Sequence, residues 1–485
     1  MIKLEDILRD VKVVKIVGDF DVTVCDVTND SRRVVPGGLF VAVRGVAVDA
    51  HRFIPAVISA GVRVVVCETL PETLVSEVTY VVVENSVIAL ARIASNRYGN
   101  PSAKLKLVGV TGTNGKTTIA TLLYHLIKHL GHKVGLLSTV CNIVDDEETE
   151  ATQTTPDHMT LNALLAQMVE RGCEYAFMEV SSHACAQHRI DGLSFAGGVF
   201  TNLTRDHLDF HKTVDDYICA KKRFFDMLPS DAFALINVDD KVGRVMVQNT
   251  RAKVYTYALR SVADYHARVV ESRLDGMSLE VCGKAVEVLL SGYFNAYNIL
   301  AVYATAGLLG FDAERSLLSL STLEPVNGRF QTIRSQRGVL GIVDYAHTPD
   351  ALDNVLSTVR AAMPAGVSGR LITVCGCGGN RDAGKRPIMA RVAARLSDVL
   401  VLTSDNPRDE DPDAILQEML AGLSDAERHD AIVITDRARA IQVACRMAVA
   451  GDVVLVAGKG HETYQEIKGV KHHFDDREQL RHCFS

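Results

Sequence analysis

Short apolar runs alternate with amphipathic stretches through the first hundred residues. The runs LFVAVRG, RVVVCE and TYVVVE lie between residues 39 and 84 and are separated by helical stretches such as FIPAVISAG. Apolar runs of this length predict buried strands, and apolar residues recurring every three to four positions predict helices. We therefore expect a small α/β domain over residues 1–103, which ends in the polar segment SNRYGNPSA.

The next two hundred residues show the same alternation around a glycine-rich turn. Residues 104–139 contain an apolar run, the turn TGTNGKTT, an amphipathic stretch and a second apolar run. This order predicts a βαβ unit. The later runs YAFMEV, GGVFTNL and FALINV continue a largely parallel sheet, and NAYNILAVYATAGLLG predicts a helix near its end. We place this central domain at residues 104–331.

The last part of the chain is the most regular. The runs GIVDYA, LITVCG, VLVLTS, AIVITD and DVVLVAG predict strands, and DALDNVLSTV, RPIMARVAARL, AILQEMLAG and ARAIQVACRMAV predict the helices between them. The pattern indicates a Rossmann-like domain over residues 332–485, without the GxGxxG turn of a dinucleotide site. The fold class expected is therefore α/β, with three domains.

Composition narrows the function classes. A chain of 485 residues exceeds what one core supports, and its net charge of -7 gives no general attraction to nucleic acid or acidic lipid. The start MIKLEDILRD is not a secretion signal, no apolar run would cross a bilayer, and the 11 cysteines include no CxxC pair. We expect a cytoplasmic monomer without nucleic-acid partners or membrane insertion.

The turn TGTNGKTT follows a strand and precedes a helix, which is the setting in which backbone amides cradle polyphosphate. A strict GxxxxGKT pattern has glycine where Val110 stands, and a structural turn is the alternative reading. We favour ATP binding, with Lys116 on the terminal phosphates and Thr117 on Mg²⁺. The residues expected to bind the phosphates are Gly112, Thr113, Asn114, Gly115, Lys116, Thr117 and Thr118.

Three further residues are informative as a set. Glu179 follows the strand YAFM, where a carboxylate can reach magnesium beside the phosphate loop, although such a residue is more often a helix cap. His207 follows another predicted strand, and Lys221 lies on a predicted helix. Taken singly, the histidine predicts only a polar loop and the lysine a solvated side chain.

The order of these blocks resembles the Mur ligase family. TGTNGKTT, EVSSHA, TNLTRDHLDFH followed by AKKRFF, GRF and DYAHTPDAL occur in the family's order, and the resemblance covers essentially the whole chain. It implies ATP-dependent amide-bond formation through an acyl phosphate. It also implies catalytic roles for Lys116, Glu179, His207 and Lys221, and two Mg²⁺ ions held by Thr117, Glu179, His207 and a CO₂-derived carbamate on Lys221. Phe224 stands where the family's AKxxLF pattern has leucine.

The resemblance also implies the substrates and their sites. These substrates are ATP, UDP-N-acetylmuramoyl-L-alanyl-D-glutamate and meso-diaminopimelate, an amino acid selected by the DNPR segment, whose arginine would pair with the distal carboxylate. For the rest of ATP it implies Asn295, Asn298, Arg329, Asp344 and His347; for the UDP substrate it implies Ser31, Thr154, Thr155, Ser181, Gln187 and Arg189. For the amino acid it implies Arg386, Asp405, Asn406, Pro407, Arg408, Gly458 and Glu462, with Glu462 receiving the distal ammonium.

Three alternatives stay open at this point. The amino acid is L-lysine in the first, and the chain is a folylpolyglutamate synthetase-like ligase in the second. In the third it is a non-catalytic nucleotide switch, because phosphate loops also serve proteins that catalyse no ligation.

Overall fold

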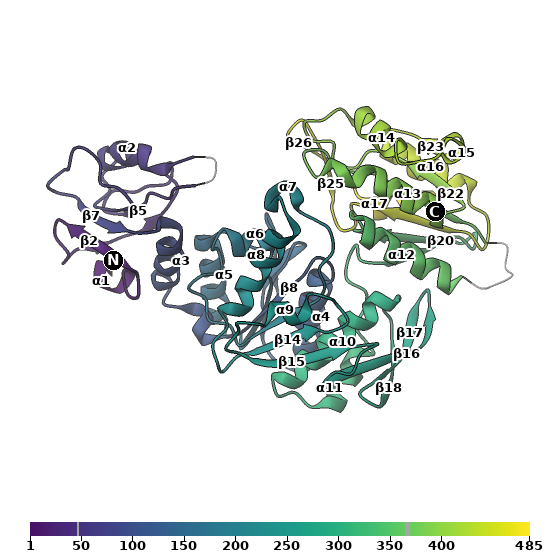
Figure 1. Cartoon of the computed structure of the whole chain (residues 1–485), viewed down its shortest axis with the longest axis horizontal. Helices are drawn as coiled ribbons and strands as arrows, with labels where there is room; N and C mark the ends of the chain where they lie inside the picture. The colour runs from purple at the N-terminus through teal and green to yellow at the C-terminus, as the bar shows by residue number, and fades with distance from the viewer. Residues whose placement is uncertain (46–47, 364–368) are drawn as a thin grey trace.

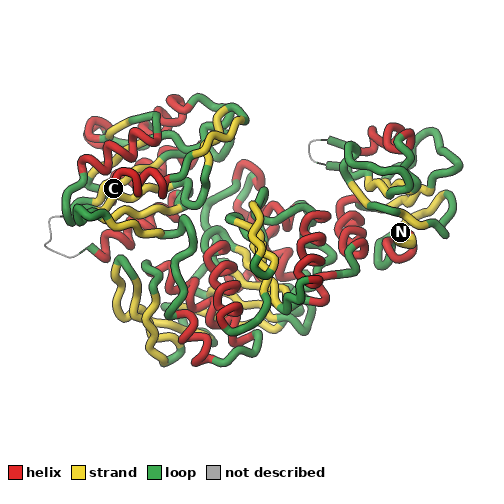
Figure 2. The backbone as a smooth tube through the Cα atoms, turned by 180° about the vertical axis from the view of Figure 1, so that it is seen from behind, coloured by secondary structure: helices red, strands yellow, loops and turns green. Residues whose placement is uncertain are grey.

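Three β-sheets follow one another along the molecule. The computed structural model describes residues 1–45, 48–363 and 369–485. Figure 1 shows the first sheet at one end, the third at the other and the largest between them. We call each sheet with its covering helices a domain, named N-terminal, central or C-terminal. Helices lie on both sides of each of these three sheets, as the view from behind also shows (Figure 2), and two two-stranded sheets lie beside them.

The N-terminal sheet has the order β2-β7-β6-β5-β4, with only β2 antiparallel to its neighbour. Its strands are β2 (Val13–Val17), β4 (Val27–Thr28), β5 (Leu39–Val41), β6 (Val64–Cys67) and β7 (Thr79–Val83); around them lie β1 (Ile2–Lys3), β3 (Thr23–Val24), α1 (Leu4–Ile7), η1 (Ala50–Phe53), α2 (Ile54–Ser59), α3 (Ser86–Arg97) and η2 (Pro101–Lys104). Successive residues of a strand face opposite sides. Val64 and Val66 accordingly pack toward α1 and α3, whereas Val65 packs toward α2.

The central sheet has the order β11-β10-β9-β12-β8-β13-β14-β15-β16-β17-β18. Its strands are β8 (Lys106–Thr111), β9 (Val134–Leu137), β10 (Cys141–Val144), β11 (Glu147–Glu150), β12 (Tyr175–Glu179), β13 (Gly197–Phe200), β14 (Phe233–Asn237), β15 (Lys253–Ala258), β16 (Tyr265–Arg273), β17 (Gly276–Val281) and β18 (Lys284–Val288). The strands from β9 to β16 in this order run parallel, and antiparallel strands extend the sheet at both edges.

Two layers of helices cover the central sheet. One layer contains α4 (Lys116–His129), α10 (Tyr293–Leu308) and α11 (Ala313–Leu320); the other contains α5 (His158–Glu170), α6 (Ser182–Ala186), α8 (Val214–Asp226) and α9 (Gly243–Met246), with α7 (Leu208–His211) just before α8. Gly109 and Gly198 lie beneath α8. A Cβ atom on either glycine would stand 2.6 and 2.8 Å, respectively, from the Phe224 ring. The absence of these side chains lets α8 lie close to the sheet.

The C-terminal sheet has the order β19-β20-β24-β21-β22-β23, and all pairs except β19–β20 are parallel. The strands are β19 (Gln331–Arg334), β20 (Leu340–Asp344), β21 (Leu371–Cys375), β22 (Val399–Leu402), β23 (Ile432–Val433) and β24 (Val453–Ala457). One face packs on α12 (Pro349–Ala362), α13 (Arg386–Leu396) and α14 (Pro412–Leu420), and the other on α16 (Arg437–Met447) and α17 (Asp476–Phe484). The remaining elements are η3 (Ala383–Lys385), α15 (Asp425–Asp430) and the hairpin of β25 (Tyr464–Ile467) and β26 (Val470–His473).

The α/β class and the three-domain architecture expected from the sequence are confirmed. The antiparallel extensions of the central sheet were not predicted, and the strand expected at AIVITD is reduced to Ile432–Val433. The boundaries at residues 103 and 331 stay a prediction. Within the described residues, no helix combines the length and the apolar character that a membrane crossing requires.

A buried ion pair supports the C-terminal domain. Arg437 and Asp476 are both fully buried and are joined by hydrogen bonds of 2.8 and 2.7 Å, and Arg437 also donates to the carbonyl of Ala457. We expect Arg437→Met to lower the free energy of unfolding by about 3–5 kcal/mol, because it leaves the Asp476 carboxylate buried without a partner. Scanning calorimetry should show the loss.

Two further variants test the cause. Arg439→Met, on the exposed side of the same helix, should change the unfolding free energy by less than about 0.5 kcal/mol. The double variant Arg437→Met, Asp476→Asn should be more stable than Arg437→Met alone. Equal stability of these two variants would contradict the assignment to an unpaired charge.

Candidate functional site

A cavity of about 950 Å³ lies between the central and C-terminal domains. Its walls are formed by segments that follow β8, β12 and β13 of the central sheet and β20, β21, β22 and β24 of the C-terminal sheet. These are carboxyl ends of parallel strands, where open α/β sheets bind ligands. The expected site residues that line it are Thr113, Asn114, Gly115, Lys116, Thr117, Thr118, Thr154, Thr155, Glu179, Ser181, Arg189, His207, Lys221, Asn298, Arg329, Asp344, His347, Asp405, Asn406, Arg408, Gly458 and Glu462.

The phosphate loop joins β8 to α4. Gly115 has φ +88°, which favours glycine, and a Cβ atom there would stand 2.6 Å from the Asn298 side-chain oxygen. Helix α4 begins at the next residue, so its unpaired amides face the cavity. The Lys116 ammonium donates to the carbonyls of Gly112 and Thr113 at 3.0 and 2.8 Å. The loop thus presents amides and one cation to an anion.

Side chains from the loop after β13 and from α8 hold the phosphate loop in place. The amide of Asn114 donates to Asn202 at 2.9 Å, and the Thr201 hydroxyl donates to the Asn114 carbonyl at 2.6 Å. Thr113 and Tyr217 share a hydroxyl–hydroxyl hydrogen bond of 3.1 Å. None of these contacts was predicted from the sequence, because each joins residues about 90 to 100 positions apart.

Glu179 ends β12 beside the phosphate loop and is 1% exposed. Its Oε1 accepts the amide of Thr139 at 2.7 Å, whereas its Oε2 is buried and has no hydrogen-bond partner among the described residues. A buried carboxylate oxygen without a donor is costly. This oxygen therefore fits a cation ligand at the position expected from the sequence.

His207 and Lys221 approach the same place from the other side. Burial lowers the pKa of His207 to about 3, so at neutral pH its ring is uncharged, the form that binds metals. The Lys221 ammonium donates to the Gly112 carbonyl at 2.7 Å and has no carboxylate partner among the described residues. Burial, followed by the charge of Lys116, lowers the pKa of Lys221 well below its usual value. A neutral amine is the form of lysine that reacts with CO₂.

The side chains at this place supply only some of the ligands that a magnesium ion requires. The described residues contain no cluster of three His, Cys, Asp or Glu side chains that would hold a metal by themselves. Glu179, the Thr117 hydroxyl and His207 supply single donors, and Mg²⁺ commonly takes its other oxygens from phosphates and water. The residues therefore fit magnesium bound together with a nucleotide, and a carbamate on Lys221 would add an oxygen donor.

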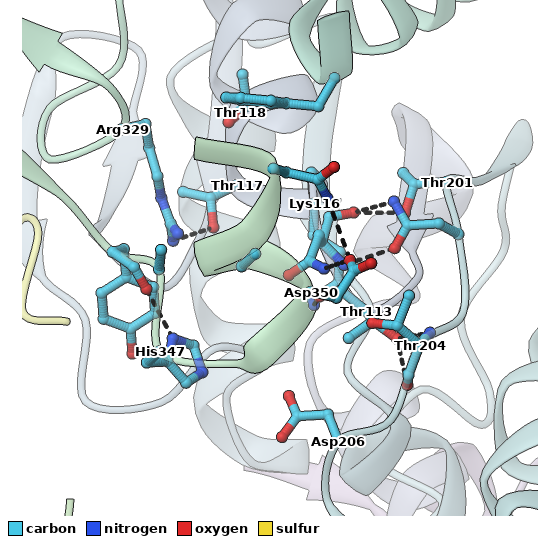
Figure 3. A pocket seen from close by; sticks show the side chains of 18 of the residues that line it. Thr113, Lys116, Thr117, Thr118, Thr201, Thr204, Asp206, Arg329, His347 and Asp350 are labelled. Atoms are coloured by element: carbon cyan, nitrogen blue, oxygen red, sulfur yellow. Dashed lines mark hydrogen bonds between the residues drawn. The ribbon is translucent and has the colours of Figure 1, made fainter. Parts of the chain in front are cut away.

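Two parts of the chain beyond the central domain contact the phosphate loop: the interdomain segment, which carries Arg329, and the start of α12. Arg329 donates to the Thr117 hydroxyl at 3.0 Å and lies over the ring of Tyr345, 4.3 Å from its centroid. Asp350, at the start of α12, accepts a hydrogen bond from Asn114 at 3.1 Å. Figure 3 shows Arg329 and Asp350 pointing toward the loop from the C-terminal side.

Asp344 and His347 line the cavity next to Arg329, at and just after the end of β20. Asp344 accepts the amides of Phe330 and Ala346 at 2.6 and 2.7 Å, and burial raises its pKa to about 6. Burial lowers the pKa of His347 to about 4. Asp344 therefore fixes the backbone next to Arg329, and His347 places a neutral imidazole at the cavity.

The other end of the cavity has an aromatic wall that was missed in the sequence. Tyr293, Phe294 and Tyr297 line it at the start of α10, facing α12. Asn298 lines the cavity, but Asn295 lies behind it, donating to the Ser291 carbonyl at 2.7 Å. The aromatic spacing in GYFNAYN was a usable signal, because flat side chains suit a base.

Small hydroxyl residues and one arginine form a third wall. Thr154, Thr155 and Ser181 lie near Arg189, which donates to the Thr155 carbonyl at 2.8 Å. Gln187 does not line the cavity and instead accepts a hydrogen bond of 3.0 Å from Arg189. Ser31 lies apart, in the N-terminal domain between β4 and β5.

The C-terminal loops carry a network of charges. Arg408 has φ +52° and donates to the Gly379 carbonyl at 2.7 Å. Glu462 accepts hydrogen bonds from both Lys459 and Asn406 at 2.8 Å. The resemblance implies that Glu462 receives the ammonium of the ligand, but in the structure Lys459 already neutralises Glu462. Pro407 supports the loop without lining the cavity.

Arg386 lies outside the cavity, although the resemblance implies that it binds the amino acid. Its side chain is 2% exposed and pairs with Glu410 and Glu418, both at 2.8 Å, outside the cavity lining. The reason is its place at the first residue of α13, which turns it toward α14. Arg381, five residues earlier, is exposed and lines the cavity instead.

Comparisons with known proteins agree with one another. Residues 24–98 match the description "Mur ligase family, catalytic domain", residues 110–306 "Mur ligase middle domain", and residues 328–460 "Mur ligase, glutamate ligase domain". The chain is 55% identical to a protein of Phocaeicola vulgatus and 56% identical to one of Bacteroides fragilis, covering 100% of this chain and 99% of each relative. Both are named UDP-N-acetylmuramoyl-L-alanyl-D-glutamate–2,6-diaminopimelate ligase.

Solved structures extend the similarity. A ligase of the same name superposes with a TM-score of 0.70 at 32% identity, over 100% of this chain and 98% of the other. A folylpolyglutamate synthase of Mycobacterium tuberculosis superposes with a TM-score of 0.61 at 16% identity, over 77% of this chain and 93% of the other. At that identity the second likeness concerns the fold alone.

The unpartnered oxygen of Glu179 can be tested by calorimetric titration of Mg²⁺ in the presence of ADP. We expect Glu179→Gln to weaken Mg²⁺ binding by roughly tenfold or more, because an amide replaces an anionic oxygen ligand. Glu174→Gln, on the exposed residue just before the same strand, is the matched control and should bind like the wild type. Unchanged affinity in Glu179→Gln would exclude Glu179 as a ligand.

Proposed function

This chain belongs to the Mur ligase family, and we propose that it uses ATP to join meso-diaminopimelate to UDP-N-acetylmuramoyl-L-alanyl-D-glutamate. One observation carries the proposal. A single cavity brings the phosphate loop and Glu179 of the central domain together with the Asn406–Arg408 loop of the C-terminal domain. The product would be the UDP-linked muramoyl tripeptide used in peptidoglycan synthesis.

The reaction proceeds in two transfers. The D-glutamyl carboxylate attacks the γ-phosphorus of ATP, the bond to ADP breaks, and an acyl phosphate forms. The amine of diaminopimelate then attacks the acyl carbon, and phosphate leaves as the amide forms. Activation is needed because a carboxylate is a poor acylating agent, and closure of the two domains keeps water from the acyl phosphate.

Residues of the phosphate loop hold the nucleotide. The α4 amides and Lys116 bind the terminal phosphates, and Arg329, which reaches Thr117 from the interdomain segment, adds a cation beside them. Tyr293 and Tyr297 take the base at the other end of the cavity. Thr117, Glu179, His207 and a carbamate on Lys221 would hold two Mg²⁺ ions, which would neutralise charge on the phosphates.

The buried surroundings of Lys221 support the carbamate. The neutral amine of Lys221 adds to the carbon of CO₂ and releases a proton, which replaces a group whose ammonium form would repel Mg²⁺ with an anionic oxygen donor. The packing of α8 holds this group at the edge of β8. The carbamate also resolves the unfavourable approach of two lysines, Lys116 and Lys221, around the Gly112 carbonyl.

The loops of the C-terminal domain bind the amino acid. Arg408 pairs with the distal carboxylate of diaminopimelate, and Arg381 binds a second carboxylate at the cavity rim. Asp405, Asn406 and Gly458 shape the pocket. L-Lysine lacks the distal carboxylate, so among the described residues Arg408 would keep only its carboxylate contact with Glu466, whose Oε2 lies 3.4 Å from Arg408 Nε.

The UDP-linked substrate binds across the N-terminal and central domains. Thr154, Thr155, Ser181 and Arg189 take the diphosphate and muramoyl parts, with Gln187 orienting the arginine. Ser31 takes part in binding uridine on the N-terminal domain. All eleven cysteines are free, which suits the reducing cytoplasm in which we place the protein as a monomer.

An assay of ADP release from the purified protein with UDP-muramoyl dipeptide tests this function. We expect release with meso-diaminopimelate and little with L-lysine or without an amino acid, because only diaminopimelate satisfies Arg408. Equal release with lysine would overturn the role of Arg408. Release without any amino acid would favour a nucleotide switch, and activity with folate and glutamate instead would favour the synthetase-like alternative.

The carbamate on Lys221 has its own test. Lys221→Ala should abolish ADP release, since both an anionic ligand and its position are lost, and acetate added at high concentration should restore part of it. Lys222→Ala is the matched control, because the neighbouring Lys222 pairs with Asp226 away from the loop. Wild-type turnover in Lys221→Ala would refute the carbamate.

A further inference from the structure

Three lysine side chains in the described part of the chain are buried: Lys221, Lys459 and, with 8% of its surface exposed, Lys385. Lys221 donates to the Gly112 carbonyl, and Lys459 donates to Asn406 and Glu462. Lys385 has neither a hydrogen bond nor an ion pair with any residue in 1–45, 48–363 or 369–485, and it lines the cavity. Buried cations in proteins are normally paired. Because Lys385 lines the cavity, its unpaired ammonium is available to an anion that enters from outside the chain.

The position of Lys385 limits which anion this is. Lys385 ends η3, and η3 rests against the central domain: Arg205 Nε lies 3.8 Å from Asp382 Oδ2, and a Cβ atom on Gly384 would stand 3.2 Å from an Arg205 nitrogen. Arg205 immediately precedes Asp206 and His207 in the chain. Lys385 therefore enters the cavity opposite the loop that carries His207.

The groups around Lys385 leave its charge available. The charged or titratable neighbours that its charge affects are Asp206, His347 and Cys377. Burial lowers the pKa of His347 to about 4, with Lys385 as the next cause, so this imidazole is neutral. Asp206 Oδ2 lies 3.4 Å from the uncharged ring of His207. Burial raises the pKa of Asp206, and His207, His347 and Lys385 are among the causes that lower it. No carboxylate within the described ranges lies within ion-pair distance of the Lys385 ammonium.

We propose that Lys385 is a further catalytic residue, whose ammonium binds the phosphoryl oxygens of the acyl phosphate from the side opposite Lys116. This inference rests on the proposed function and adds the C-terminal domain to the phosphoryl site. As the amine nitrogen bonds to the acyl carbon, the bond from that carbon to the phosphate oxygen breaks and its electron pair leaves with phosphate. The amine loses its proton to water. Lys385 stabilises the charge that accumulates on the leaving phosphate.

The arrangement also ties chemistry to closure of the two domains. Lys116 belongs to the central domain and Lys385 to the C-terminal domain, so both cations reach one phosphoryl group only when the domains meet. The carboxylates of diaminopimelate have other partners, because Arg381 and Arg408 lie on the neighbouring loops of the same domain. The competing hypothesis is that Lys385 binds a carboxylate of diaminopimelate, and the test below distinguishes the two roles.

Steady-state kinetics of ADP release separate these roles. For Lys385→Met we expect kcat to fall roughly 100- to 1,000-fold, as on loss of a group that stabilises transition-state charge, with KM for diaminopimelate within about twofold of wild type. Mg·ADP binding by calorimetry should not change. Lys385→Arg, which keeps the charge, should recover part of kcat. Arg381→Met should show the opposite pattern, with a raised KM for diaminopimelate.

The other outcomes overturn the proposal. A raised KM for diaminopimelate with kcat retained in Lys385→Met would make Lys385 an amino-acid anchor, and wild-type kinetics would make it a structural residue. Lys253→Met, on an exposed residue of β15, controls for loss of a lysine. If Lys385→Met fails to fold, Lys385→Gln keeps a polar group of similar length and must show the same fall in kcat. Absence of diaminopimelate-dependent release in the wild type would instead refute the proposed function.

Discussion

The close packing of α8 on the central sheet is the contact on which the site depends. Phe224 lies against two strands at glycine positions, Gly109 and Gly198, where a methyl group would collide with the ring. Because α8 can approach this closely, Lys221, one turn earlier, reaches the carbonyl of Gly112 in the phosphate loop. The same helix contributes Tyr217, whose hydroxyl contacts Thr113. A helix held farther from the sheet would separate the lysine from the loop.

Several cations line the cavity, although the chain as a whole carries a net charge of -7. Among them are Lys116, Lys385 and Arg329, and none of these three forms an ion pair with a carboxylate in the described part of the chain. Asp and Glu side chains outnumber Lys and Arg side chains in the lining, so the cavity as a whole is not positively charged. These three cations suit a reaction whose nucleotide, acyl phosphate and released phosphate are all anions.

The interdomain segment links nucleotide binding to the C-terminal domain. Asp344, at the end of β20, accepts the amide of Phe330 and so fixes the residue after Arg329 to the C-terminal sheet. Arg329 lies over Tyr345 of the same domain while its other end contacts Thr117. Movement of the C-terminal domain would carry this arginine and Lys385 together toward or away from the phosphates. Closure and assembly of the phosphoryl site are thus one event.

The sequence by itself determined the α/β class, the three sheets, the phosphate loop and the family, because each is encoded in local periodicity or in contiguous motifs such as TGTNGKTT. Only the tertiary structure decided which residues face the cavity. Arg386 and Arg381 lie in one motif, but the start of α13 turns the first toward Glu410 and Glu418 and leaves the second at the cavity. Lys459 and Lys385 both follow a glycine in the sequence, yet Lys459 is paired with Glu462 and Lys385 has no partner in the part of the chain that the structure describes. A side chain's partners come from segments far apart in the chain, and local patterns carry no information about them.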